Sequence, residues 1–212
     1  MKQNLANRAN YGEQRSTKNI KYIVLHYTAN DGDTDENNGT YFHNNKVDAS
    51  AHYFVDSDSV TISVPDNYVA WSVGASVYKH PDCRNANSLN IEICDDIRNG
   101  VIYPSQATIN NAIELTKNLM KEYNITPDRV IRHYDVTGKK CPMYWVDDSK
   151  WETEFHSKLK AATPTPAVNP NQNIDVAKSF DKSFARTYTV DSYDGVLELK
   201  PKADENSTSI TQ

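Results

Sequence analysis

Short apolar runs alternate with polar segments through the first 160 residues of the chain. The run IKYIVLHYTA, residues 20–29, is rich in β-branched and aromatic residues and predicts a buried strand that ends at His26 and Tyr27. Residues 50–65 predict two further strands around the turn DSDS, and SLNIEICDD, residues 88–96, predicts another short strand. These runs are the expected strands of a largely buried sheet.

Helical periodicity is clearest in TINNAIELTKNLMKEYN, residues 108–124, where apolar residues recur at the spacing of one helix face. The polar residues 31–45 predict a loop followed by the start of a helix, and DDSKWETEFHSKLKAA, residues 147–162, predicts a last helix. Residues 125–138, ITPDRVIRHYDVTG, predict a strand and then a loop. Strands that alternate with helices predict an α/β domain over residues 1–161, with a central mixed β-sheet flanked by helices.

The pattern changes after residue 161. Residues 162–173, ATPTPAVNPNQN, are rich in proline and predict an extended linker. Residues 174–212 form a short C-terminal segment that ends in the polar stretch KPKADENSTSITQ. A stretch of that composition cannot bury enough apolar surface to fold, so we expect part of this tail to be disordered.

Composition and charge exclude several classes of function. The formal net charge of −5 disfavours a nucleic-acid binder, because such proteins use a basic surface. No run approaches the roughly 20 apolar residues of a membrane span, so we expect no membrane insertion. The first residues, MKQNLANRANYGEQRS, lack the apolar core of a signal peptide. We therefore expect synthesis in the cytoplasm, with any action outside the cell requiring another route of exit.

The segment IRHYDVTGKKCP, residues 131–142, carries the main candidate chemistry. His133 and Cys141 are separated by the length of a loop, and His26 ends another strand-like run, so the three side chains could meet. Two histidines and a cysteine form the three-ligand arrangement of a catalytic Zn²⁺ site, with the fourth position left open for water. The spacing alone also allows an incidental pair, or a reactive thiol activated by the two adjacent lysines.

The other cysteines do not form a disulfide framework with Cys141, because three cysteines leave at least one unpaired. A single bridge between Cys83 and Cys94 remains possible at this stage.

Four ordered blocks carry a resemblance to a known family: VLHYTAND, SAHYFVD, SLNIEIC and RHYDVTGKKCP. Together they resemble the zinc-dependent N-acetylmuramoyl-L-alanine amidases, which include enzymes of phage endolysins and bacterial autolysins and are related to the peptidoglycan recognition proteins. The resemblance covers residues 1 to about 160. It implies zinc-dependent hydrolysis of the amide bond between N-acetylmuramic acid and L-alanine in peptidoglycan, at a zinc site in a surface groove.

The resemblance also implies roles for individual residues. His26, His133 and Cys141 match the zinc ligands of the family. Lys139 matches a lysine that stabilises the transition state, and Glu92 matches the general base. Zinc lowers the pKa of bound water towards 7, a carboxylate can take the proton of that water, and a fixed cation stabilises the oxyanion that forms.

Two further positions have both a functional and a structural interpretation. Tyr53 matches a tyrosine that lies near the zinc-bound water in other branches of the family, but it could equally be a packed strand residue. Trp71 could line the substrate groove or pack in the core. Many members have a histidine after the position of Trp71, and this chain has Ser72 there, which puts one substrate contact in doubt.

The resemblance extends weakly to the C-terminal segment. VAKSFDKSFARTYTV, residues 176–190, is similar to the entry of SH3-like wall-binding domains, but the continuation typical of those domains is missing. We interpret residues 174–212 as a truncated or diverged wall-binding segment. We expect a monomer with peptidoglycan as its partner, acting on the cell wall after lysis or holin-type export.

Two alternative functions remain open. A non-catalytic peptidoglycan-binding module would share the fold, but such proteins often lose the zinc cysteine, whereas this chain has all three ligand residues. A cysteine peptidase using Cys141 and His133 would resist chelators. The proline directly after Cys141 disfavours it, since a helix N-terminus usually follows such a nucleophile.

Overall fold

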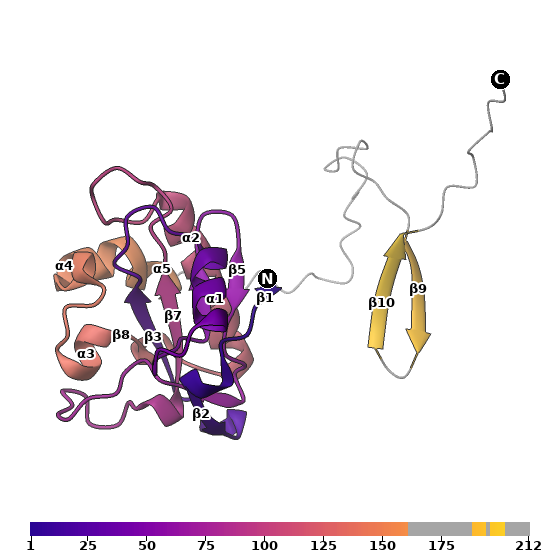
Figure 1. The fold of residues 1–212 in the computed structure, drawn as a ribbon, viewed down its shortest axis with the longest axis horizontal. Coiled ribbons are helices and arrows are strands. Elements are labelled where there is room, and N and C mark those ends of the chain that lie inside the picture. The colour runs from indigo at the N-terminus through magenta and orange to yellow at the C-terminus, as the bar shows by residue number, and fades with distance from the viewer. Residues whose placement is uncertain (161–187, 194–195, 202–212) are drawn as a thin grey trace, which may run out of the picture. The chain divides into compact units, whose positions relative to one another are not determined.

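The computed structural model describes residues 1–160, 188–193 and 196–201. A six-stranded mixed sheet forms the centre of the first unit, with strand order β1-β5-β4-β7-β3-β8 (Figure 1). The neighbouring strands β4, β7, β3 and β8 are parallel to one another, and β5 is antiparallel to β4. The strands of this sheet are β1 (Lys2–Gln3), β3 (Tyr22–Tyr27), β4 (Tyr53–Val55), β5 (Val60–Ile62), β7 (Ser88–Ile93) and β8 (Val130–Arg132). A second, two-stranded sheet pairs β2 (Tyr11–Gln14) with β6 (Tyr68–Ala70).

Helices cover both faces of the central sheet. One face packs on α2 (Gln106–Tyr123) and on the C-terminal helices, and its core includes Leu25, Ile91 and Trp145. The C-terminal helices are α4 (Asp148–Trp151), a π-helical turn (Glu152–His156) and α5 (Ser157–Lys160). The opposite face carries the smaller clusters, in which Val24 packs near Val136 of α3 (His133–Thr137), and Phe54 packs near Phe42 of α1 (Asp35–Asn44). The central mixed sheet flanked by helices is therefore confirmed.

The alternation of side chains along the parallel strands explains these two faces. Leu25 and Ile91 point into the larger core, whereas the residues that follow them, His26 and Glu92, point to the opposite face. The same alternation places Phe54 beside Glu92. One face of the sheet therefore carries the large apolar core, and the other carries the polar candidate residues.

Capping residues define the ends of the longer helices. Thr34 and Ser105 accept hydrogen bonds from the backbone of the first turns of α1 and α2. At its other end, α2 stops at Asn124, whose φ of 52° lies in the left-handed region. These boundaries agree with the amphipathic helix predicted over residues 108–124.

One local prediction was wrong. The residues after β8 were expected to form a loop, and residues 133–137 form the short helix α3 instead. Its first turn is capped by Asp135, whose Oδ2 accepts the backbone N–H of Arg132 at 2.9 Å. A helix of five residues is too short to produce a periodic pattern that could be recognised in the sequence.

The chain divides into two units, residues 1–163 and residues 164–212. In the second unit, β9 (Tyr188–Tyr193) and β10 (Val196–Pro201) form an antiparallel pair. The predicted linker 162–173 lies outside the described residues, and the wall-binding interpretation of 174–212 stays a prediction. Within the described parts of both units, no helix is long and apolar enough to cross a membrane.

Candidate metal centre and active site

Two adjacent parallel strands bring His26 and His133 together. His26 lies near the carboxyl end of β3, and His133 follows directly after β8, the neighbour of β3 in the sheet. Parallel strands end at the same edge of a sheet, so the two rings meet, with 3.1 Å between their Nδ1 atoms. Both histidines are buried, at 1% and 5% exposure.

The turn after α3 brings Cys141 to the same point. Helix α3 ends at Gly138, whose φ of 85° lies in the left-handed region that favours glycine. The chain then folds back, and the backbone N–H of Tyr134 donates to the carbonyl of Cys141 at 2.9 Å. Cys141 Sγ lies 3.8 Å from His26 Nδ1, and the donor atoms of His26, His133 and Cys141 all lie within 4.8 Å of one another.

The chemistry of these three donors fits a zinc ion. Burial lowers the pKa of His133 to about 4 and lowers the pKa of His26 far below its usual value, with the neighbouring His133 adding to the effect. Both rings are therefore neutral, which is the form that binds metal. Burial raises the pKa of the Cys141 thiol to about 12, so this cysteine becomes a thiolate at neutral pH only when a cation is bound to it. Two imidazoles and one thiolate form a ligand set that suits Zn²⁺.

Glu92 lies next to His26 because the two residues are paired across β7 and β3. Its Oε1 is 3.9 Å from His26 Nδ1, and its side chain is 22% exposed. Its Oε2 is buried and has no hydrogen-bond partner in the described chain, so this oxygen is available to a ligand. Burial raises the pKa of Glu92 to about 8, and the charge of Lys139 acts in the opposite direction.

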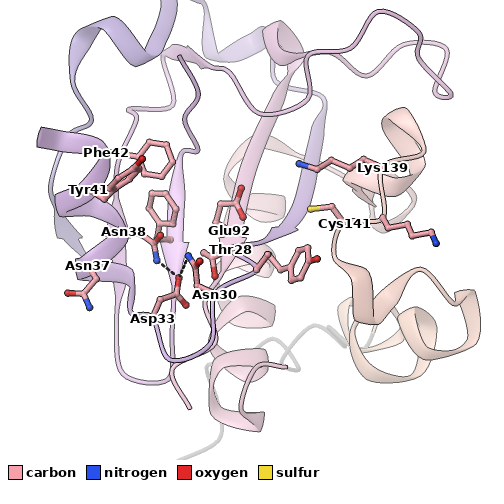
Figure 2. A pocket seen from close by; sticks show the side chains of 14 residues that line it. Thr28, Asn30, Asp33, Asn37, Asn38, Tyr41, Phe42, Glu92, Lys139 and Cys141 are labelled. Atoms are coloured by element: carbon pink, nitrogen blue, oxygen red, sulfur yellow. Dashed lines mark hydrogen bonds between the residues drawn. The ribbon is translucent and has the colours of Figure 1, made fainter. Parts of the chain in front are cut away.

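A pocket of about 670 Å³ is lined by Glu92 and Cys141, whereas His26 and His133 are not among its lining residues. In Figure 2, Asn37, Asn38, Tyr41 and Phe42 of α1 form one wall, Lys139 and Cys141 lie on the opposite side, and Glu92 lies between them on the sheet. The hydroxyl oxygen of Thr28, a further lining residue, is also buried and has no partner. The complete lining is Tyr27, Thr28, Ala29, Asn30, Asp33, Asn37, Asn38, Tyr41, Phe42, Phe54, Glu92, Lys139, Lys140 and Cys141.

Tyr53 and Trp71 are not brought to this pocket. Tyr53 pairs with Ile91 and belongs to the large core on the other face of the sheet. Its hydroxyl donates to the carboxylate of Asp66 at 2.8 Å. Trp71 follows β6, is 37% exposed, and is not a lining residue of the pocket. The expected place of Tyr53 near the metal-bound water does not agree with its position, and we assign neither residue a catalytic role.

The sequence motifs did not identify Asn90 as a residue of the site. Asn90 is fully buried in β7, and its Oδ1 lies 3.0 Å from Nε2 of His26. A signal was present in the strand SLNIEIC, because Asn90 and Glu92 are two residues apart and therefore share a face. The possible bridge between Cys83 and Cys94 is absent, since all three cysteines are free.

Comparison with known proteins agrees with this geometry. The family model described as N-acetylmuramoyl-L-alanine amidase matches residues 16–144. The chain belongs to this amidase family. The resemblance carried by the four sequence blocks is thereby confirmed.

Curated members of the amidase family are similar to most of this chain. The N-acetylmuramoyl-L-alanine amidase CwlL of Bacillus licheniformis is 36% identical over 160 residues, which make up 71% of this chain and 43% of CwlL. The amidase CwlA of Bacillus subtilis is 32% identical over 161 residues, covering 74% of this chain and 57% of CwlA. The chain thus spans less than half of CwlL and somewhat more than half of CwlA.

Solved structures share the fold of this chain. The structure of PlyL is 29% identical and has a TM-score of 0.62, covering 75% of this chain and 96% of PlyL. The solution structure of the PlyG catalytic domain is also 29% identical with a TM-score of 0.62, covering 78% of this chain and 98% of that domain. The similarity therefore extends over almost the whole of each of those two structures.

Proposed function

We propose that this protein is a zinc-dependent amidase that hydrolyses the bond between N-acetylmuramic acid and L-alanine in peptidoglycan. The observation that carries the proposal is the meeting of His26, His133 and Cys141 beside Glu92, next to a pocket that Glu92 and Cys141 line. Family membership and the named activity of the relatives support the choice of substrate. Under this proposal the protein acts on the cell wall after lysis or holin-type export.

Each residue of the site has a defined task in this reaction. His26, His133 and Cys141 would hold Zn²⁺, which supplies Lewis acidity and lowers the pKa of a bound water. Glu92 is placed to take a proton from the attacking water and to pass it to the leaving amine, because its Oε2 has no partner in the chain. Lys139 lines the same pocket and would stabilise the oxyanion of the tetrahedral intermediate.

Two observations favour this function over its alternatives. A pure binding module does not require an unpartnered carboxylate oxygen beside a set of metal donors, and Glu92 provides one here. A cysteine nucleophile requires a thiolate, whereas burial of Cys141 favours the thiol.

The decisive experiment combines zinc content with hydrolysis of purified peptidoglycan. We expect one zinc ion per chain, loss of hydrolysis on chelation, recovery on addition of zinc, and release of new α-amino groups without new reducing sugars. The variant Cys141→Ser should lose zinc and activity. The matched variant Cys83→Ser, which alters another buried free thiol, should keep both. Hydrolysis that survives chelation and the Cys141→Ser substitution would contradict the proposal, and zinc binding without hydrolysis would favour the binding module.

A further inference from the structure

We propose that Asn90 is a positioning residue that holds the ring proton of His26 on Nε2 and so keeps Nδ1 free to bind the metal. This inference rests on the metal centre of the proposed function and assigns a role to a residue outside the ligand set. The second ring nitrogen of a metal-bound histidine commonly donates to a protein acceptor, which fixes the tautomer and the orientation of the ring.

The direction of each hydrogen bond around Asn90 can be worked out from its partners. The Ser88 hydroxyl lies 2.9 Å from the carbonyl oxygen of Arg84, and a carbonyl can only accept, so the hydroxyl donates to it. Ser88 Oγ is then an acceptor for the amide Nδ2 of Asn90, at 3.2 Å. This assignment turns the amide oxygen of Asn90 towards His26 Nε2, at 3.0 Å. An oxygen that faces Nε2 requires the proton to be on Nε2.

The backbone around Asn90 is fixed from the neighbouring strand. The Asn90 N–H donates to Nδ1 of His52 at 3.1 Å, and the His52 N–H donates to the Asn90 carbonyl at 3.0 Å. Arg15 Nη1 also donates to the Ser88 carbonyl at 2.9 Å. Ser88, His52 and Asn90 are all fully buried, so solvent cannot take over the role of the amide.

The consequence appears at the other side of the His26 ring. With the proton on Nε2, the lone pair of Nδ1 points towards His133 Nδ1 and Cys141 Sγ, at 3.1 and 3.8 Å. His26 Nδ1 is thus free to bind a metal ion, and in the metal-free chain it accepts a hydrogen bond from His133 Nδ1, which gives up that proton when the metal binds. The opposite tautomer would put a proton where the metal binds and would place two acceptors, Nε2 and the Asn90 oxygen, against each other.

The test compares Asn90→Leu, which removes the acceptor at similar size, with Asn90→Asp, which keeps an oxygen facing Nε2. The first readout is the zinc dissociation constant of the full chain, measured by competition with a chromophoric chelator. The second is the tautomer of His26 in the zinc-free chain, read from ¹⁵N chemical shifts of the ring. The variant Thr116→Val is the control, because it removes a different fully buried polar group, on α2.

We expect Asn90→Leu to weaken zinc binding about 10- to 100-fold and to give a mixture of His26 tautomers. Asn90→Asp should restore most of the affinity, and Thr116→Val should behave as the wild type. If Asn90→Leu does not fold, Ser88→Ala provides the test, since it releases the amide of Asn90 and should produce the same tautomer mixture. Wild-type zinc affinity and a single His26 tautomer in these variants would overturn this inference but leave the proposed function unaffected. A wild-type chain that binds no zinc would overturn the proposed function as well.

Discussion

Lys139 and Lys140 are adjacent exposed residues that both line the pocket, and only one matches the family lysine that stabilises the transition state. Lys139 is the one whose charge acts on Glu92 and on His133. We predict that Lys139→Ala lowers kcat about 10²- to 10³-fold, as removal of one oxyanion-stabilising group does in other enzymes. Lys140→Ala is the matched control and should change kcat less than tenfold. Steady-state hydrolysis of a soluble muropeptide measures both, and equal losses in the two variants would contradict the assignment.

At the residue scale, the sequence identifies those functional side chains that belong to a recognisable motif. His26, His133 and Cys141 were predicted from spacing and resemblance, and the structure brings their donor atoms together. Asn90 could not be assigned in this way, because its contact with His26 depends on the pairing of β3 with β7. Tyr53 was placed in the site by resemblance alone, and strand alternation puts it on the other face.

At the scale of the element, the short helix α3 and its C-terminal turn decide where Lys139 and Cys141 lie. Gly138 ends α3 with a φ of 85°, and a Cβ at this position would meet no atom within 4 Å. The cost of a side chain there is therefore one of backbone conformation only. We predict that Gly138→Ala lowers the free energy of unfolding of the zinc-free chain by about 1–2 kcal/mol.

Two further variants test this backbone explanation. Gly138→Asn should cost less than Gly138→Ala, because asparagine tolerates the left-handed region. Gly74→Ala is the control, since its Cβ would meet only Asn85 at 3.7 Å and no positive φ is involved. Urea denaturation gives all three values, and equal stability of Gly138→Ala and the wild type would refute the argument.

The prediction of elements succeeded where a pattern was long enough to show a period. Helix α2 and strands β3 and β7 were predicted within a few residues of their ends, because each buries one face or both. Helix α3 was missed because its ends are fixed by Asp135 and Gly138, and a single turn carries no periodicity. The sequence also could not give the order of the strands, which results from contacts between distant parts of the chain.

At the scale of the whole molecule, buried histidines link folding to pH. Burial and the nearby charge of Arg15 lower the pKa of His52 to about 3, while an unfolded histidine has a pKa near 6.5. Between these values the unfolded chain binds the proton and the folded chain does not, so stability falls as the pH falls through this window. His26 and His133 act in the same direction in the zinc-free protein.

The variant His52→Gln isolates one of these contributions. Glutamine can accept a hydrogen bond from the Asn90 N–H but takes up no proton. The number of protons that the chain takes up on unfolding should therefore fall by up to one, and the free energy of unfolding should depend less steeply on pH. This corresponds to a difference of at most about 1.4 kcal/mol per pH unit. Urea unfolding of the zinc-free wild type and variant between pH 4 and 7 measures the two slopes. Parallel curves would mean that His52 is not a source of the acid sensitivity.

His26 and Glu92 are paired across β3 and β7, so the hydrogen bonds between these strands fix the distance between the two backbone positions. Neighbouring strands lie about 4.8 Å apart, and this interval is set by the backbone and not by any side chain. A shift of one residue in the register would move every side chain of the strand to the other face of the sheet. The register can therefore change only in steps of two residues, roughly 6.6 Å, if Glu92 is to stay on the same face. Under the proposed function, the distance from the proton acceptor to the metal therefore depends on the length and the rotamer of the side chain at position 92. Under the proposed function, aspartate at that position would hold its carboxylate one methylene closer to the strand than glutamate does.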